Sequence, residues 1–330
     1  IIIIIIIIIL EVLIAVCCCF GNMSVIVALW ISKCFKQPTF CLIASLAVAD
    51  FMVGCVTIPL ALVVEGQRMK TSFDSCLFFS CVVILFTVVS TLSLVVIAVD
   101  RFLRVYIPLR YKTSLIHRHT RLVVAACWLV AVPLSFTPML GWHNPKPPPN
   151  TDNSSSFCDF MVVIPMSYLV YFNCFVCTVI PLLIMAVLYG YIFCTFRVNL
   201  REKPGCGAHR QSQSDLKKEK ELAGSLSLVV ALYALTWLPL QIMNCIDYFI
   251  GSSVVPLPAV CIGVFLTHAN SAVNPIVYAF KIQKIRSAYV KIWRRFTERR
   301  GENRGLQTNQ TNQTSRINLS SNINSVTKTE

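Results

Sequence analysis

The chain has 330 residues, of which 56% are hydrophobic and only 13% are charged, and its mean hydropathy is +0.69. Soluble domains carry about 25% charged residues, so the composition excludes an ordinary soluble protein and favours one embedded in membrane lipid. The net charge is +14. The basic residues are divided among four separate segments rather than gathered on one face, which argues against nucleic acid as a partner.

Apolar segments of membrane-spanning length recur along the whole chain. A helix needs roughly 20 apolar residues to cross about 30 Å of hydrocarbon. Seven segments meet this requirement, so the sequence predicts an all-α fold, a seven-transmembrane helix bundle. In chain order the predicted spans are 3–31, 39–64, 76–99, 121–140, 162–194, 223–250 and 257–280.

The distribution of basic residues orients this bundle. Segments 32–38, 100–121, 195–222 and 281–330 together hold 26 of the 29 Lys and Arg residues. Cytoplasmic loops carry the excess of Lys and Arg, so these four segments are predicted to be cytoplasmic. We therefore expect a multi-pass membrane protein with its N-terminus outside and its C-terminus in the cytoplasm.

The segments outside the spans have distinct compositions. Residues 281–296 mix basic and apolar side chains, which predicts a short amphipathic helix on the membrane surface after the seventh span. The folded domain is accordingly predicted to cover 1–296, and the polar segment 297–330 to be a disordered cytoplasmic tail. Asn153 begins an Asn-Ser-Ser sequon in an outer loop, where we expect glycosylation.

Most of the 16 cysteines lie inside apolar spans, where cysteine behaves as a small hydrophobic residue. Cys76 and Cys158 instead lie on the outer, oxidising side, where they can pair. We expect a disulfide between them.

Asp50 is a carboxylate at membrane depth, and it needs a cation, a proton or hydrogen-bond donors there. Ser90, Asn270, Ser271 and Asn274 could surround it with oxygen atoms that suit a small hard cation such as an allosteric sodium ion. The alternative is a structural network linked by water without an ion. No other cofactor is expected.

Asp100 and Arg101 form a charged pair at the inner end of the third span, and Glu219 lies near the inner start of the sixth. An arginine that only extends to the membrane surface needs no acidic partner. Two carboxylates within reach of one arginine therefore favour a switch that clamps two helices.

Prolines recur within the spans at Pro59, Pro181, Pro239 and Pro275, and each can kink its helix. Trp237 lies two residues before Pro239. It is either a core residue beside a bend or part of a hinge that senses a ligand, and both interpretations stay open.

These features together resemble the rhodopsin-like family of G-protein-coupled receptors, from about residue 11 to residue 296. The resemblance implies a receptor, and neither a nucleophile–base pair nor metal-ligand spacing in the sequence favours an enzyme. It also assigns Tyr189, Pro275 and Tyr278 to the moving cytoplasmic end. The matching residues are Gly21-Asn22, Asp50, Cys76, Asp100-Arg101, Trp128, Pro181, Tyr189, Trp237-Leu238-Pro239, Asn274-Pro275 and Tyr278.

Within that family the chain is most similar to adenosine receptors. Receptors for amines place Asp at the position of Val83, and opsins place Lys at the position of His268. The segments that carry the similarity are Tyr171-Phe172-Asn173, Trp237-Leu238-Pro239-Leu240 and Thr267-His268-Ala269-Asn270-Ser271.

The resemblance implies a nucleoside pocket for adenosine. Phe160 matches an aromatic residue that stacks on the adenine ring, and Asn244 matches an amide that binds its amine and a ring nitrogen. Leu240 matches the apolar floor, with Trp237 beneath the sugar. The other implied pocket residues are Thr87, Thr267 and His268 at the ribose, and Glu11 paired with His268.

The chain departs from the adenosine-receptor pattern at Met161, Gln241, Phe102 and Tyr233. Type-3 receptors also have an apolar residue at the position of Met161, so the resemblance favours a divergent type-3-like receptor, with type 1 next. The resemblance implies inhibitory heterotrimeric G proteins and lower cyclic AMP, with arrestin and receptor kinases as further partners. The alternative is a rhodopsin-like receptor for another small neutral or lipid ligand.

Overall fold

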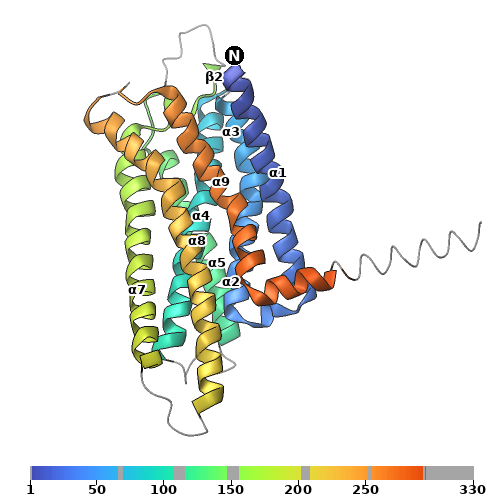
Figure 1. Ribbon diagram of the computed structural model, residues 1–330. Helices are drawn as coiled ribbons and strands as arrows, with labels where there is room; N and C mark the ends of the chain where they lie inside the picture. The colour runs from blue at the N-terminus through green and yellow to red at the C-terminus, as the bar shows by residue number, and fades with distance from the viewer. Residues whose placement is uncertain are drawn as a thin grey trace, which may run out of the picture.

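The helices of the protein run side by side in one elongated bundle, and a further helix after α9 runs across its lower end (Figure 1). This arrangement is seen in a computed structural model. The structure describes residues 2–65, 70–107, 116–146, 156–201, 209–251, 254–292 and 294.

The elements of the bundle follow the apolar segments of the sequence. The α-helices are α1 (Ile2–Ile31), α2 (Pro38–Met52), α3 (Ile58–Glu65), α4 (Phe73–Tyr106), α5 (Ile116–Ser135), α6 (Phe160–Val163), α7 (Ile180–Arg201), α8 (His209–Phe249) and α9 (Leu257–Lys281). The remaining elements are the 3₁₀ turns η1 (Cys34–Lys36) and η4 (Thr137–Leu140), the π-helical segments η2 (Val53–Thr57) and η5 (Tyr168–Val179), and the strands β1 (Lys70–Thr71) and β2 (Ser156–Phe157).

Within the described residues, six helical segments have the length and composition of a membrane span, and His119–Ser135 is a shorter apolar helix. The predicted all-α bundle is therefore confirmed, and the chain is a multi-pass membrane protein. The six segments are Ile5–Ile31, Pro38–Val63, Phe73–Tyr106, Tyr168–Val198, Glu219–Phe249 and Leu257–Lys281.

Two predicted spans are less regular than the sequence indicated. The span predicted at 39–64 contains η2 just before Pro59, and the span predicted at 162–194 contains η5 just before Pro181. Proline lacks an N–H and clashes with the carbonyl four residues earlier, so the backbone widens into a π turn in each case. The fifth span also starts later than predicted, because α6 ends at Val163 before Pro165.

Cys76 and Cys158, the pair expected from the sequence, form a disulfide in the structure. Beside it, β1 pairs with β2 in antiparallel register, with Lys70 opposite Phe157. We call this the disulfide end of the bundle, and Figure 1 places the N-terminus there as well.

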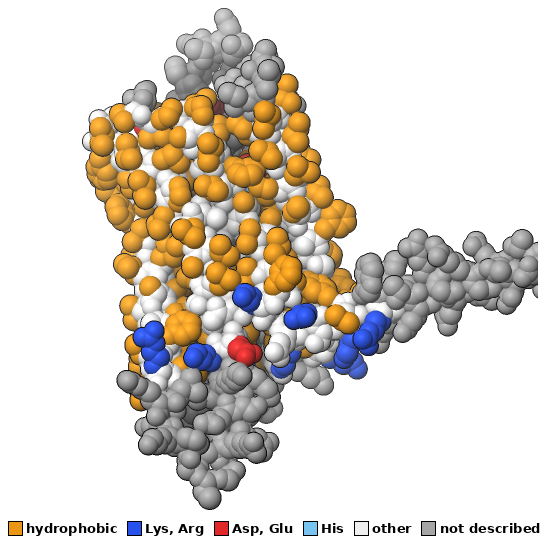
Figure 2. All heavy atoms as spheres, in the orientation of Figure 1, with side chains coloured by type: hydrophobic (Ala, Val, Ile, Leu, Met, Phe, Trp, Pro, Cys, Tyr) orange, Lys and Arg blue, Asp and Glu red, His pale blue; other side chains and the backbone are white. Residues whose placement is uncertain are grey.

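The opposite end carries the positive charge, and we call it the basic end. Figure 2 shows the Lys and Arg side chains of the viewed face gathered at this end, while hydrophobic side chains cover the flank above them. Residues 283–292 form the helix that crosses this end. It buries Ile285 and Ala288, and its Tyr289 hydroxyl lies 3.0 Å from Ser24 Oγ of α1. Trp293, residues 295–330 and Asn153 lie outside the described residues.

Candidate functional site

The charged groups at the basic end connect α4 to α8. Arg101 Nη1 donates to Glu219 Oε2 at 2.9 Å, and Arg101 Nε donates to Asp100 Oδ2 at 3.0 Å. Arg101 is only 2% exposed, so both carboxylates offset a positive charge held at membrane depth. The three residues that the sequence assigned to a clamp are therefore brought together; we call Asp100, Arg101 and Glu219 the basic-end clamp.

Two further residues belong to this cluster and were missed in the sequence. Thr39 of α2 donates from Oγ1 to Asp100 Oδ2 at 2.6 Å and also accepts from Arg101. Arg104, one turn after Asp100, reaches Glu219 Oε1 with Nη1 at 3.4 Å. The position of Arg104 three residues after Arg101 was a usable signal, whereas an ordinary threonine at the start of a span is not.

Asp50 of α2 lies fully buried near the middle of the bundle, where α4 and α9 contribute donors to its carboxylate. Oδ1 accepts from Ser90 Oγ at 3.0 Å and from Ser271 Oγ at 2.9 Å. Oδ2 accepts from Asn274 Nδ2 at 2.7 Å. We call Asp50, Ser90, Ser271 and Asn274 the Asp50 cluster. It places α2, α4 and α9 around one negative charge.

The chemistry of the Asp50 cluster fits a small hard cation. Carboxylate, hydroxyl and amide oxygens are the ligands that such ions prefer. Asn274 donates its amide N–H to Asp50. Its Oδ1 is buried without a hydrogen-bond partner among the described residues. An amide oxygen without a hydrogen-bond partner, next to a carboxylate, can coordinate a cation.

Asn270 is placed differently from the rest of that predicted set. It lies four residues before Asn274, one helical turn nearer the disulfide end. Its Oδ1 accepts from Thr236 Oγ1 of α8 at 3.4 Å, and the described residues show no hydrogen bond between Asn270 and Asp50. Its role as an ion ligand stays a prediction.

Trp237 lies in the interior of the bundle, on the side of the Asp50 cluster that faces the disulfide end. Its ring stacks on Tyr233 one turn earlier, with centroids 5.7 Å apart. The Tyr233 hydroxyl lies 2.8 Å from Thr91 Oγ1, which joins α8 to α4. The Trp237 Nε1–H is buried with no partner in the described chain, so a donor remains available beside Pro239.

His268 of α9 and Glu11 of α1 meet in the disulfide half of the bundle. His268 Nδ1 lies 2.8 Å from Glu11 Oε2, and both side chains are buried. A polar pair at this depth fixes the imidazole ring, and it joins segments 257 residues apart in sequence. The pairing inferred from the resemblance therefore exists in the structure.

The two threonines assigned to the same pocket lie on α4 and α9. Thr87 Oγ1 donates to the carbonyl of Ile84 at 2.7 Å, and Thr267 Oγ1 donates to that of Val264 at 2.7 Å. Each hydroxyl bonds within its own helix and keeps acceptor lone pairs for another partner.

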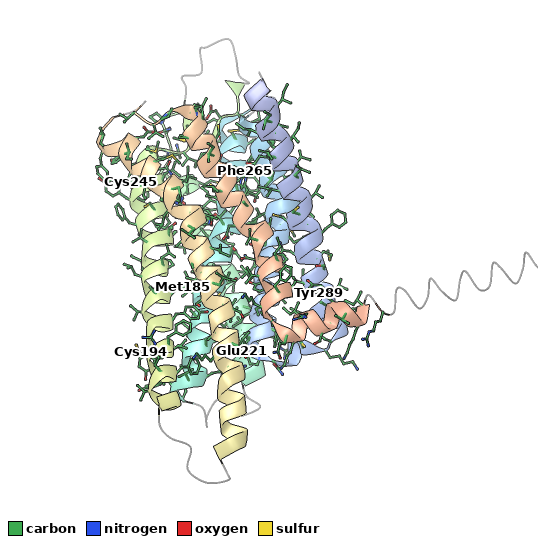
Figure 3. The ribbon with its side chains drawn as sticks, in the orientation of Figure 1. Met185, Cys194, Glu221, Cys245, Phe265 and Tyr289 are labelled. Carbon is green, nitrogen blue, oxygen red and sulfur yellow. A yellow bond between two sulfur atoms is a disulfide. The ribbon has the colours of Figure 1, made fainter. Side chains whose placement is uncertain are left out.

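Asn244 lies in the last two turns of α8, one residue before Cys245, which Figure 3 labels near the disulfide end. Its side chain is half-buried, and its amide has no hydrogen-bond partner among the residues that the structure describes. Leu240 lies one turn below. A Cβ on Gly263 of α9 would come within 3.1 Å of Leu240 Cδ1, so α8 and α9 approach closely there.

Phe160 reaches this half of the bundle from the outer loop. It begins α6 two residues after Cys158, and Asp159 caps this helix by accepting from the Met161 N–H at 2.8 Å. The disulfide ties the loop to α4, so Phe160 packs half-buried against the core beside Cys76. Met161 is exposed.

Two of the three residues assigned to the moving end, Tyr189 and Tyr278, lie in one buried cluster. Tyr189 of α7 and Tyr278 of α9 belong to the same apolar core as Tyr233 and Trp237. The Tyr278 hydroxyl is buried without a partner among the described residues. Pro275 packs against α1, where a Cβ on Gly21 would lie 3.1 Å from its Cγ.

Three features of the bundle are typical of a membrane receptor. They are a buried carboxylate that accepts several hydrogen bonds, an ion-paired arginine at one end, and polar groups without internal partners among the described residues toward the other end. The family described as "7 transmembrane receptor (rhodopsin family)" matches residues 21–278, and the chain belongs to this family. It is therefore a receptor and not an enzyme.

Among characterised proteins, the chain is similar to adenosine receptors. It is 40% identical to adenosine receptor A3 of Ovis aries over 274 residues, which are 82% of this chain and 84% of the relative. Adenosine receptor A3 of Bos taurus has the same identity and coverage. Human adenosine receptor A2a is 37% identical over 295 residues, which are 86% of this chain and 70% of the relative.

Proposed function

We propose that the chain is a G-protein-coupled receptor for extracellular adenosine in the plasma membrane. The observation that carries this proposal is the similarity to adenosine receptors over most of the chain. The Glu11–His268 pair, which the resemblance in sequence implied, supports it. The orientation follows from the basic residues: the disulfide end faces outside, with Asn153 glycosylated, and the basic end faces the cytoplasm.

In the proposed complex, adenosine binds in the disulfide half of the bundle. Asn244 offers an unpaired amide that can donate and accept at the purine edge. Phe160 supplies an aromatic face from the outer loop, and such stacking is worth roughly 0.5–1.5 kcal/mol beyond burial. Leu240 and Trp237 form the apolar floor, while Thr87, Thr267 and His268 contact the ribose.

The proposed response is a shift between two conformations of the bundle. Adenosine can move this equilibrium only by binding one conformation more tightly than the other. We propose that the favoured conformation moves the inner end of α8 away from α4, so that Arg101 leaves Glu219. The opened basic end, with Tyr189, Pro275 and Tyr278 rearranged, then accepts the G protein, and arrestin and receptor kinases act on the same end.

We further propose that an allosteric sodium ion binds at Asp50, Ser90, Asn270 and Asn274. The ion supplies a positive charge that offsets the buried carboxylate. The unpartnered Oδ1 of Asn274 supports this assignment. Because Ser90, Ser271 and Asn274 tie α4 and α9 to Asp50 of α2, the cluster stabilises the conformation with the intact basic-end clamp.

We propose type-3-like specificity and coupling to inhibitory G proteins. Met161 supports the subtype, because type-3 receptors also have an apolar residue at this position, where most adenosine receptors have Glu. Gln241 is a departure from both patterns. Gln241 Nε2 lies 3.4 Å from Thr178 Oγ1, while its Oε1 is buried and unpaired among the described residues. Gln241 can therefore take part in ligand selection one turn below Asn244.

Cyclic AMP measured in cells that express the chain tests this proposal. Adenosine should lower forskolin-stimulated cyclic AMP, and pertussis toxin should abolish the effect. A rise in cyclic AMP would contradict inhibitory coupling while leaving adenosine as the ligand. No adenosine response and no displacement of a labelled adenosine analogue would favour the alternative, a receptor for another small neutral or lipid ligand.

A further inference from the structure

Two cysteine sulfurs meet at the interface between the first two membrane spans. Cys19 Sγ of α1 lies 3.2 Å from Cys55 Sγ of η2, and both thiols are free. The helices approach closely at this level, since a Cβ on Gly54 would come within 2.9 Å of Cys19 Sγ. A disulfide needs about 2.05 Å between its sulfurs, so a closing movement of roughly 1 Å would join them.

The neighbouring cysteines of α1 are not placed for the same reaction. Cys18 is buried and directs its Sγ toward the carbonyl oxygen of His268 at 3.9 Å, on the side of α9. Cys17 is exposed and has no sulfur partner in the described part of the chain. Of the three consecutive cysteines, the geometry selects Cys19.

We propose that Cys19 and Cys55 are a redox modification site, a dithiol that hydroperoxides oxidise to a disulfide between the first and second spans. Cys55 is exposed on the outside of the bundle, inside the span Pro38–Val63. The medium around it is lipid, so the oxidant class that reaches it is the fatty acyl hydroperoxide. This site is independent of the proposed ligand and G protein.

The reaction has two balanced steps. The Cys55 sulfur takes the terminal oxygen of the hydroperoxide, giving a sulfenic acid, while the O–O bond breaks and an alcohol leaves. The Cys19 sulfur then attacks the Cys55 sulfur, the S–S bond forms and water leaves. The two thiols lose two electrons in total, and the hydroperoxide gains them.

The disulfide would fasten α1 to the irregular part of the second span. η2 begins three residues after Asp50, and Cys19 lies three residues before Asn22. Asn22 Nδ2 in turn donates to the carbonyl of Ser271, next to the Asp50 cluster. Oxidation should therefore restrain the first two spans beside the Asp50 cluster and raise the melting temperature of the receptor.

Peptide mapping of the full-length receptor in phosphatidylcholine vesicles tests the proposal. The vesicles are treated with cumene hydroperoxide, an apolar hydroperoxide, and free thiols are then blocked with N-ethylmaleimide. Trypsin cleaves after Lys33 and Lys36 and so separates Cys19 from Cys55. The expected product is one joined peptide with maleimide on Cys17, Cys18 and Cys41. Apart from these labels it is lighter than the two reduced peptides by two hydrogen atoms, and dithiothreitol separates it.

Variants distinguish the cysteine that is oxidised first, Cys55, from the one that then attacks it, Cys19. Cys55→Ser should abolish the joined peptide. Cys19→Ser should also abolish it, but should leave a Cys55 sulfenic acid that dimedone captures. Cys17→Ser, the matched control on the same helix, should leave the joined peptide unchanged.

Two results would overturn the proposal, and both are read from the unmutated receptor or the control. One is oxidation of Cys55 without any joined peptide. The other is a joined peptide whose fragmentation places the cross-link on Cys17 instead of Cys19, since both residues lie in the peptide that ends at Lys33. Retention of the Cys76–Cys158 disulfide in each variant shows that the bundle has folded.

Discussion

The two ends of the bundle differ in how their polar groups are satisfied. At the basic end, Arg101 is paired with Asp100, Glu219 and Thr39, all from the chain itself. At the disulfide end, the Asn244 amide has no partner in the described chain. Deeper in the same half, neither has the Trp237 Nε1–H. One end is closed by internal bonds, and the other keeps groups available for a ligand.

This difference indicates how a signal would cross the membrane. At the disulfide end, the unpaired polar groups form hydrogen bonds only when a ligand binds. At the basic end, the hydrogen bonds of the clamp must break before a protein partner can bind there. The Asp50 cluster lies between them and ties α2, α4 and α9 together. Each prediction below alters one of these regions, in order of decreasing expected effect.

Replacing Asn244 with Ala should weaken binding of adenosine analogues the most. The change leaves the polar purine edge buried without a partner, which costs about 1–3 kcal/mol, or roughly a 5- to 150-fold loss of affinity. Competition binding on membranes measures it. The matched control is Ile242→Ala, because Ile242 is exposed on the same helix. Unchanged affinity in Asn244→Ala would remove Asn244 from the pocket.

Replacing Asp50 with Asn should abolish any effect of sodium on agonist binding. The neutral amide no longer offers the negative charge that attracts the cation. Agonist affinity is measured with sodium and with N-methylglucamine at equal ionic strength. Ser80→Ala serves as the control, since within the described segments this buried hydroxyl bonds to the Cys76 carbonyl of its own helix and to nothing else. A sodium effect that persists in Asp50→Asn would refute the ion site.

Replacing Glu219 with Gln should raise basal G-protein activation by up to about fivefold. The Glu219 side chain is 38% exposed, so solvent screens its bond to Arg101 and the pair is worth about 1 kcal/mol at most. Nucleotide exchange without ligand measures the change. Glu221→Gln is the control, because Glu221 is exposed two residues further along α8 (Figure 3). Equal basal rates in both variants would argue against the clamp.

Replacing Tyr233 with Phe should have the smallest effect. It removes the hydrogen bond to Thr91 between α8 and α4, worth about 0.5–1.5 kcal/mol, and keeps the stacking on Trp237. The melting temperature should fall by a few degrees, about 2–4 °C per kcal/mol. Adding Thr91→Val should cause little further loss. Fully additive effects would show that the two hydroxyls do not act on each other.

The sequence predicted the bundle and much of the site because membrane depth restricts polar residues. Asp50, Ser90 and Asn274 could be grouped from the sequence alone, since each is a polar residue in an apolar span. Arg101 and Glu219 could be paired because the predicted topology placed both at one end. These predictions needed only the order and length of the spans.

Other contacts could not be predicted from the sequence, because they depend on the rotation of each helix about its axis and on where each helix ends. Thr39 is an ordinary residue at the start of a helix, and only the packing of α2 on α4 brings it to Asp100. Asn270 contacts Thr236 because α8 and α9 pack closely at that level. The contact between Cys19 and Cys55 requires the π turn of η2, whose exact position the sequence does not specify.

The central claim is that the disulfide end and the basic end take part in one equilibrium. Adenosine affinity of Glu219→Gln, compared with that of the unmutated receptor in membranes without G protein, tests it most directly. If weakening the clamp populates the ligand-preferring conformation, affinity must rise by about the same factor as basal activity. Raised basal activity with unchanged adenosine affinity would contradict the account.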